Sequence, residues 1–357
     1  MGKSPLTKFL ALVLVGLPVF LIYLFFTVGV NEIMGVLGKL DLCNYLLYYT
    51  AALAAVFLST LFYSMSWNKL MKPMGIKIGL KKAFLYCWLG GFLDAIIPFE
   101  TVSGEMAKIY LVQRETGEQP GKIIASIVAH RIIVISIALG SLMVSSIFLI
   151  TRYDVGSGII YPLSIVMLGS AAVIALLLFA SLRKGVAEKI INAILNFISF
   201  TFRKRVINLL KIRENVYMNL QYFYNEFRNI SSRRWTLTLA VLYGFLAWLS
   251  HLSVFILTFY ALGFSEIIFR FYETIVVYSI SMALQAAPIS IVAPGLMEII
   301  MSNLYVLLGF EPALSGAATF LIRIATFWLQ IMSGGIIVQW IGVKNIFEQI
   351  LKNTSTC

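Results

Sequence analysis

Long apolar runs constrain the fold of this chain more than any other feature. A helix needs about 20 apolar residues to cross a bilayer. Six runs reach that length, at residues 7–30, 44–67, 122–150, 159–182, 235–262 and 313–341. Charged residues make up only 12% of the sequence, against about 25% in a soluble domain, which is too few to cover a globule in water. The sequence therefore predicts an all-α polytopic integral membrane protein, with residues 1–357 forming a single transmembrane domain.

Two further apolar segments, residues 80–114 and 271–309, are broken near their middle by proline and glycine. The interrupting residues are Pro98 and Gly104 in the first segment, and Pro288, Pro294 and Gly295 in the second. Each segment is long enough for two short helices but short for two full spans and a loop. We predict that both are re-entrant helical hairpins, with two additional spans each as the alternative.

The distribution of basic residues predicts the orientation in the membrane. Of the 28 Lys and Arg residues, 23 fall in one set of loops, and the opposite loops hold only Lys39, Arg152 and Arg270. Because Lys and Arg collect in cytoplasmic loops, both termini are predicted to be cytoplasmic. The net charge of +12 is therefore assigned to membrane orientation, and nucleic acid is not an expected partner.

The longest polar stretch, residues 183–234, has two amphipathic helical patterns separated by Arg203, Lys204 and Arg205. Apolar residues recur on one face of each pattern, and the stretch carries eleven of the basic residues. Anionic headgroups attract such segments, so we predict a pair of cytoplasmic surface helices. A gating or partner-docking role is the alternative for this stretch.

An internal repeat relates the two halves of the chain. Gly117, Pro120 and Arg131 recur 192 residues later as Gly309, Pro312 and Arg323. The first repeat unit is placed at residues 44–150 and the second at residues 235–342. Because the first broken hairpin is expected to enter from the cytoplasmic face and the second from the outer face, the two units are predicted to be inverted. Inverted repeats with broken helices are typical of transporters.

Arg131 and Arg323 are the two basic residues inside predicted spans. Each lies about ten residues into its helix, or about 15 Å deep, which is half of a hydrocarbon core of about 30 Å. Two interpretations remain open. In the first, Glu105 pairs with Arg131 and Glu298 with Arg323, which locks each hairpin to the following span. In the second, both guanidinium groups face a shared cavity and bind an anionic group such as a phosphate.

The sequence contains no pattern typical of a catalytic or metal centre. The three cysteines have no metal-ligand spacing, and no Asp-x-Asp motif or nucleotide-binding loop is present. His130 is adjacent to Arg131 but points about 100° away around the helix, so a packed or lipid-facing imidazole is expected. We therefore predict no catalytic residues, no metal and no cofactor.

Two short motifs and the two arginine spans resemble the lysylphosphatidylglycerol synthase transmembrane, or flippase-like, family. Residues 98–108 (PFETVSGEMAK) are similar to that family's first Pro-to-Gly-Glu element, followed by a basic residue, here Lys108. Residues 288–298 (PISIVAPGLME) are similar to its second element, which ends in Glu. The chain departs from the family pattern at Ser103, where a second glycine is usual, and after Gly295, where a further glycine is usual. The resemblance extends over residues 7–343.

The resemblance implies a translocase that moves a lipid with a polar headgroup between the leaflets of a bacterial or archaeal cell membrane. In some relatives the region is fused to a soluble transferase domain, which does not fit into this chain. We expect a flippase-like lipid transporter that works by alternating access on a phosphate-bearing headgroup or a polyprenyl-linked lipid. Its expected substrate-binding residues are Arg131, Arg323, Glu105, Glu298 and Lys108, and the glutamates meet a headgroup amine or carry a coupling proton. The alternatives are an integral-membrane enzyme acting on a lipid-linked substrate, with Glu105 or His130 as base, and an ion-coupled carrier of a small anion.

Overall fold

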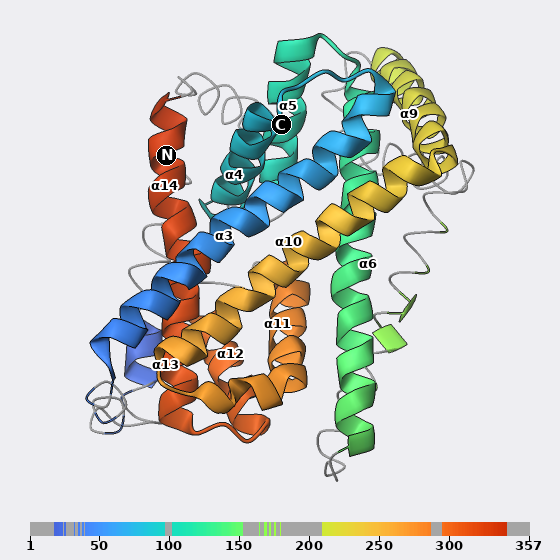
Figure 1. Ribbon diagram of the computed structural model, residues 1–357. Helices are drawn as coiled ribbons and strands as arrows, with labels where there is room; N and C mark the ends of the chain where they lie inside the picture. Colours follow the sequence, from blue (N-terminus) through green and yellow to red (C-terminus); the bar gives the residue numbers. More distant parts are fainter. Residues whose placement is uncertain are drawn as a thin grey trace. The chain divides into compact units, whose positions relative to one another are not determined.

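A computed structural model describes residues 18–23, 40–96, 102–152, 209–286 and 295–340, together with scattered residues between 25 and 38 and between 164 and 179 (Figure 1). The described part is helical and contains no β-strand, which confirms the all-α prediction. Its long elements are α3 (Leu42–Met71), α4 (Leu80–Ile96), α5 (Val102–Thr116), α6 (Pro120–Arg152), α9 (Leu209–Ser232), α10 (Arg234–Ala261), α11 (Phe271–Ala286), α12 (Leu296–Leu307), α13 (Pro312–Arg323) and α14 (Leu329–Trp340). Short 3₁₀ helices at Lys72–Met74 (η1) and Ser265–Arg270 (η2) and a π-helical turn at Ile324–Trp328 (η3) complete this part.

Four helical stretches in the described part are long and apolar enough to cross a membrane. They are Leu42–Met74, Pro120–Thr151, Arg234–Ala261 and Pro312–Ile337. These stretches confirm four of the six predicted spans to within a few residues, except that the first extends through η1. The predicted spans at residues 7–30 and 159–182 lie almost wholly outside the described residues.

Each of the two predicted broken segments contains two short helices. The first segment forms α4 and α5, of 17 and 15 residues, and the second forms α11 and α12, of 16 and 12 residues. None of these four helices reaches the length of about 20 residues that a perpendicular crossing requires. The connecting residues 97–101 and 287–294, with Pro98, Pro288 and Pro294, lie outside the described part. Re-entry into the membrane and the inverted repeat remain predictions.

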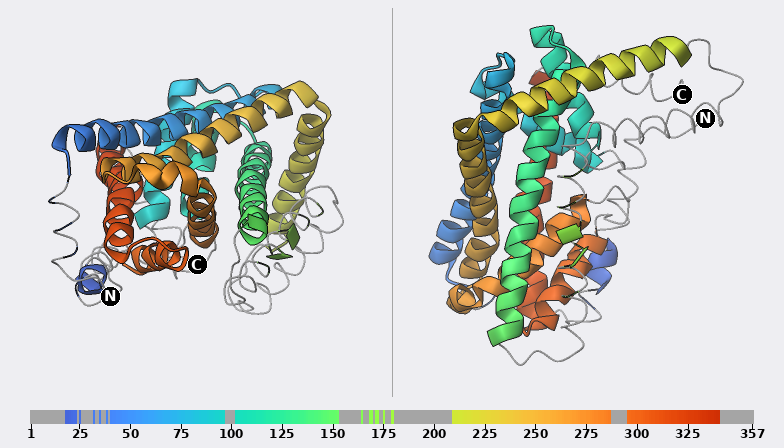
Figure 2. Two further views of the ribbon diagram at one scale, coloured as in Figure 1. Left: turned by 60° about the horizontal axis from the view of Figure 1, so that its bottom comes forward. Right: turned by 90° about the vertical axis from the view of Figure 1, so that its right-hand side faces the viewer.

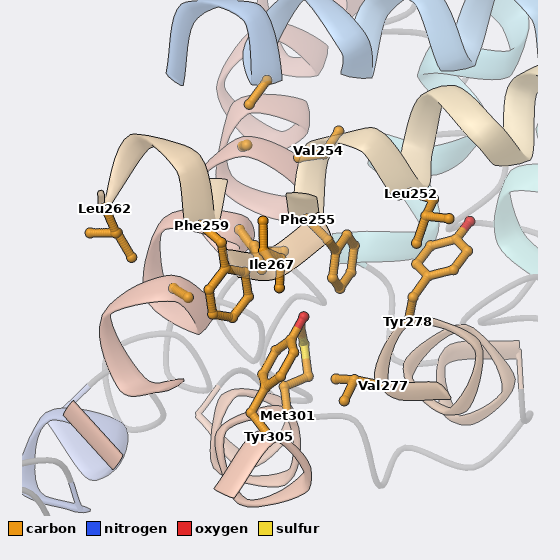
Figure 3. Close-up of a cluster of buried hydrophobic side chains, with 14 of the residues drawn as sticks. Leu252, Val254, Phe255, Phe259, Leu262, Ile267, Val277, Tyr278, Met301 and Tyr305 are labelled. Carbon is orange, nitrogen blue, oxygen red and sulfur yellow. The ribbon is translucent and has the colours of Figure 1, made fainter. Parts of the chain in front are cut away.

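The chain folds into two compact units that interleave along the sequence. Unit 1 comprises Met1–Leu61, Phe84–Lys108 and Ala247–Cys357, and unit 2 comprises Phe62–Ala83 and Ile109–Leu246. In unit 1 a large apolar core joins the C-terminal half of α10 to α11, α12 and α13. Figure 3 shows Phe255 and Phe259 of α10 facing Met301 and Tyr305 of α12 across this core.

In unit 2, α9 lies across the N-terminal end of α6 (Figure 2). The backbone N–H of Gly121 donates to the side-chain oxygen of Asn219 at 2.9 Å. A Cβ at position 121 would lie 2.2 Å from the carbonyl oxygen of Asn219, so glycine allows this close approach of the two helices. The end of α3 is fixed to α6 by the indole of Trp67, which donates to the hydroxyl of Ser126 at 3.0 Å.

Candidate functional site

The first turn of α5 is capped by a carboxylate from the preceding helix. Asp94, near the end of α4, accepts the backbone N–H of Gly104 at 2.7 Å and the hydroxyl of Ser103 at 3.1 Å. The first N–H groups of a helix have no partner within the helix, and a side-chain oxygen that accepts one of them stabilises the helix start. Asp94 therefore ties the two helices of the first broken segment together, although residues 97–101 separate them in sequence.

The first turn of α12 is capped in a related way by a residue of its own. Glu298, the third residue of α12, accepts the backbone N–H of Gly295 through Oε2 at 2.6 Å. Gly295 has a φ of +95°, which a residue with a side chain adopts only under strain. Both broken segments thus direct a carboxylate at the start of their second helix. Each carboxylate accepts a hydrogen bond from a backbone N–H at a helix start. Its negative charge therefore partly neutralises the partial positive charge of that helix end.

Glu298 also forms a buried ion pair with Arg323 at the end of α13. Nε of Arg323 donates to Oε1 of Glu298 at 2.8 Å, and only 4% and 5% of the two side chains are exposed. The guanidinium group also lies over the ring of Phe327, 4.3 Å from its centroid. The sequence predicted this pair as one of two interpretations of the intramembrane charges, and the two side chains do meet.

A π-helical turn follows Arg323 directly. Residues Ile324–Trp328 adopt the wider π-helical winding between α13 and α14. α6 continues as regular α-helix past Arg131, the residue that the predicted repeat aligns with Arg323. A π-turn inserts a residue into a helix and is frequent at functional sites. The turn was not predicted from the sequence, because no proline or glycine lies within residues 324–328.

The buried charges of the first broken segment pair within α5. Nζ of Lys108 lies 2.8 Å from Oε2 of Glu105, with 6% and 15% of the two side chains exposed. Lys108 was expected at the site, but not as the partner of Glu105. The alternative prediction, a pair between Glu105 and Arg131, stays a prediction. Arg131 lies half-buried on α6 in unit 2, whereas the other predicted substrate-binding residues belong to unit 1.

Glycines allow the helices around this charged region to approach closely. A Cβ at Gly104 would lie 2.3 Å from the carbonyl oxygen of Gly90 on α4, and a Cβ at Gly91 would meet the amide of Gln330 on α14. A Cβ at Gly334 of α14 would lie 2.4 Å from the ring of Phe92. Gly104, predicted as a residue of the break, lies in the first turn of α5 and serves this packing. The signal for this packing in the sequence is the adjacent pair Gly90 and Gly91, for which no role was predicted.

The two histidines pack against aromatic rings. His130 is 2% exposed, and its ring meets Tyr63 edge-on with centroids 4.3 Å apart. His251 lies 5.3 Å from the ring of Tyr278 in unit 1. No group of three or more His, Cys, Asp and Glu side chains in the described part of the chain could hold a metal ion.

Comparison with known proteins identifies the family of the chain. Residues 9–334 match the family model described as the lysylphosphatidylglycerol synthase TM region. The chain belongs to this family. A UPF0104 membrane protein of Pyrococcus horikoshii is 24% identical over 334 residues, which cover 92% of this chain and 95% of that protein. A UPF0104 membrane protein of Methanothermobacter thermautotrophicus is 21% identical over 326 residues, covering 91% and 93% of the two chains.

Membership of the lysylphosphatidylglycerol synthase TM-region family agrees with the helices described above. Four apolar helices of spanning length, together with the family match and the two membrane-protein relatives, make the chain a multi-pass membrane protein. The match extends over α3 to α13, so both broken segments, the Glu105–Lys108 pair and the Glu298–Arg323 pair lie within the family region.

Proposed function

We propose that this protein moves a lipid with a phosphate-bearing polar headgroup between the two leaflets of a cell membrane. The observation that carries the proposal is the burial of the Glu298–Arg323 pair in an apolar unit, beside a capped helix start and a π-turn. Removing two charges from water costs several kcal/mol per ion, and well-packed apolar residues are often no less stable in their place. An ionisable side chain buried within a membrane-spanning segment therefore indicates a functional site by default.

Arg323 is the residue to which we assign the phosphate. A guanidinium group presents several N–H donors in a planar fork that suits phosphate oxygens. Only Nε is used in the bond to Glu298, and the terminal nitrogens remain for a ligand when the side chain turns. The acyl tails stay in the bilayer while the headgroup enters between helices, and rocking of the broken segments exchanges access between the two faces.

Transport in proteoliposomes tests this function. The purified protein is reconstituted with a fluorescent phospholipid that an impermeant reductant quenches in the outer leaflet, and the fraction quenched over time reports movement between leaflets. We expect more complete quenching with the protein than with empty vesicles. No protein-dependent movement for any headgroup across an anionic, zwitterionic and polyprenyl-phosphate series would contradict the proposal.

A double substitution separates a phosphate role from a structural role of the pair. Glu298→Gln with Arg323→Met removes both charges together, keeps an acceptor for Gly295 and preserves most of the side-chain volume. We expect this variant to fold and to lose lipid movement. Transport at the unsubstituted rate would mean that Arg323 does not bind the headgroup.

A further inference from the structure

Three buried hydroxyl groups around the α12–α13 hairpin have no hydrogen-bond partner among the described residues: Ser302 Oγ, Tyr305 OH and Thr319 Oγ1. All three residues are 0% or 1% exposed. An unsatisfied hydroxyl in an apolar interior costs about 1–3 kcal/mol, so three of them in one small region need an explanation. Buried polar groups of this kind are commonly satisfied by single internal waters.

Two of these hydroxyls fall on one row with the Glu298–Arg323 pair. The helices α12 and α13 pack against each other and are joined by the short turn at residues 308–311, so they run antiparallel. Ser302 follows Glu298 by one helical turn, and Thr319 precedes Arg323 by one turn, so each shares the face of its helix that carries the ion pair. Going from Glu298 to Ser302 along α12, and from Arg323 to Thr319 along α13, leads toward the connecting turn in both cases. Ser302 and Thr319 are therefore expected to lie opposite each other in the α12–α13 interface.

Tyr305 lies one helical turn after Ser302 on α12, closer to the connecting turn at residues 308–311. Its ring packs against Phe259 and Phe310, with centroids 5.0 and 5.1 Å away. Figure 3 shows its hydroxyl extending from α12 toward Phe255 of α10. Beyond Tyr305, Gly309 and Glu311 of the connecting turn are exposed. Arg270 of η2 donates to the carbonyl oxygen of Gly309 at 2.9 Å.

Other buried hydroxyls in unit 1 behave differently. Thr258 and Ser281 donate to the carbonyl oxygens of Val254 and Val277, four residues earlier in their own helices, at 2.7 Å each. Ser302 and Thr319 make no such bond within the described chain, although the same carbonyl position lies within reach in any helix. Their hydroxyls are therefore available to ligands in the interface.

We propose that water bridges these hydroxyls into a proton path from the connecting turn to Glu298. A proton from water enters at the turn, each oxygen along the path accepts one proton and releases another, and the last O–H bond forms on the Glu298 carboxylate. When the broken segments rock to the other access state, that O–H bond breaks and the proton passes to water on the opposite side of the membrane. An ionised carboxylate has about four acceptor positions, and Glu298 uses two of them, for Gly295 and Arg323. Its remaining lone pairs can receive the proton.

Protonation of Glu298 would change what Arg323 binds. A proton on Glu298 removes the negative charge of the ion pair, and the Arg323 guanidinium becomes available to a headgroup phosphate. The charged and titratable groups on the elements of this core include Arg323 on α13, Tyr305 on α12, Glu273 and Tyr278 on α11, and His251 on α10. Arg270 of η2, which donates to the carbonyl oxygen of Gly309, adds a positive charge at the connecting turn. Glu273, which is 6% exposed, also has a carboxylate oxygen, Oε2, without a hydrogen-bond partner among the described residues. This coupling rests on the proposed lipid transport and supplies its driving force from a proton gradient.

Proton movement into proteoliposomes tests the path directly. The purified chain is reconstituted around a trapped pH-sensitive dye, and a pH step is applied outside. We expect protein-dependent acidification with the unsubstituted chain, and loss of most of it in Thr319→Val and in Ser302→Ala. Thr258→Val and Ser281→Ala are matched controls, because they remove equally buried hydroxyls that are already satisfied, and they should conduct as the unsubstituted chain does. No protein-dependent acidification, or equal rates in all five proteins, would overturn the path.

Lipid movement measured in the same vesicles separates the two proposals. We expect an inward proton gradient to accelerate lipid movement in the unsubstituted chain and the controls, but not in Thr319→Val. If lipid moves at a rate independent of the gradient, the proton path is wrong and the lipid transporter stands. If protons move through the hydroxyl row while no lipid moves, the path stands and the lipid assignment is wrong. The thermal unfolding midpoint of each detergent-solubilised variant verifies that it is folded.

Discussion

Arg323 Nε and Glu298 Oε1 lie 2.8 Å apart in the interface of α13 and α12, with 4% and 5% of the side chains exposed. Because the second oxygen of Glu298 holds the N–H of Gly295, one carboxylate fixes both the start of α12 and the position of the intramembrane arginine. The broken segment, the ion pair and the π-turn are therefore parts of one connected structure.

Removing one partner of this pair should destabilise the protein more than removing both. Arg323→Met leaves the Glu298 carboxylate buried without its counter-charge, which costs about 3–5 kcal/mol. The double variant Glu298→Gln with Arg323→Met removes that charge and should recover most of the loss. The thermal unfolding midpoint in detergent measures both. A double variant no more stable than Arg323→Met would contradict this account of the pair.

Loss of the Asp94 carboxylate should loosen the start of α5. Asp94→Ala removes the acceptor for the N–H of Gly104 and for the Ser103 hydroxyl, which should cost about 0.5–2 kcal/mol, as for other helix caps. Asp94→Asn keeps one oxygen acceptor and should cost less. Amide hydrogen exchange at residues 102–106 reports the loosening, and equal protection in the alanine variant and the unsubstituted chain would rule out the cap.

Gly104→Ala should destabilise unit 1 through a backbone clash. The added Cβ would lie 2.3 Å from the Gly90 carbonyl oxygen, so α4 and α5 must separate, at about 1–3 kcal/mol for an overpacked site. Gly140→Ala is the control. It lies inside α6 with nothing within 4 Å of an added Cβ, so the better helix propensity of alanine should stabilise the protein by about 0.5–1 kcal/mol. The same sign of change in both variants would contradict the packing argument.

Gly121→Ala should displace α9 from α6 in unit 2. Its Cβ would lie 2.2 Å from the carbonyl oxygen of Asn219, and backbone cannot move aside as a flexible side chain can. We expect faster proteolysis and faster hydrogen exchange in α9, with the rest of α6 unchanged. Asn219→Ala removes the side-chain acceptor of the Gly121 N–H without adding a clash and should have a smaller effect of about 1 kcal/mol. An α9 equally protected in Gly121→Ala would show that the close approach is not required.

The sequence predicted the helices well because their signal is local. Four described helices of spanning length coincide with predicted spans, and each broken segment contains two short helices. Apolar length and helix-breaking residues act on the segment that contains them, whatever its neighbours are. Pairing of Glu298 with Arg323 was one of the two interpretations predicted from the sequence, because an isolated charge in an apolar environment is unfavourable.

Other parts of the candidate site could not be predicted because they depend on which elements meet. Glu105 had more than one basic residue within reach of its predicted position, and only the folded backbone determines that Lys108 lies 2.8 Å away. The cap of α5 by Asp94 and the contact of Gly104 with Gly90 are likewise relations between helices. The π-turn after Arg323 has no signature in composition or periodicity.

The amino-acid sequence alone was enough to predict that this chain forms apolar helices for a membrane, that two segments are broken, and that a few charges lie among them. It could do so because a bilayer excludes unpaired backbone and unpaired charge at every position alike. Only the folded backbone determines which carboxylate caps which helix, which charges pair, and which hydroxyls have no partner among the described residues. Those outcomes follow from distances of a few ångströms between residues far apart in the chain, and hydrophobicity carries no information about such distances.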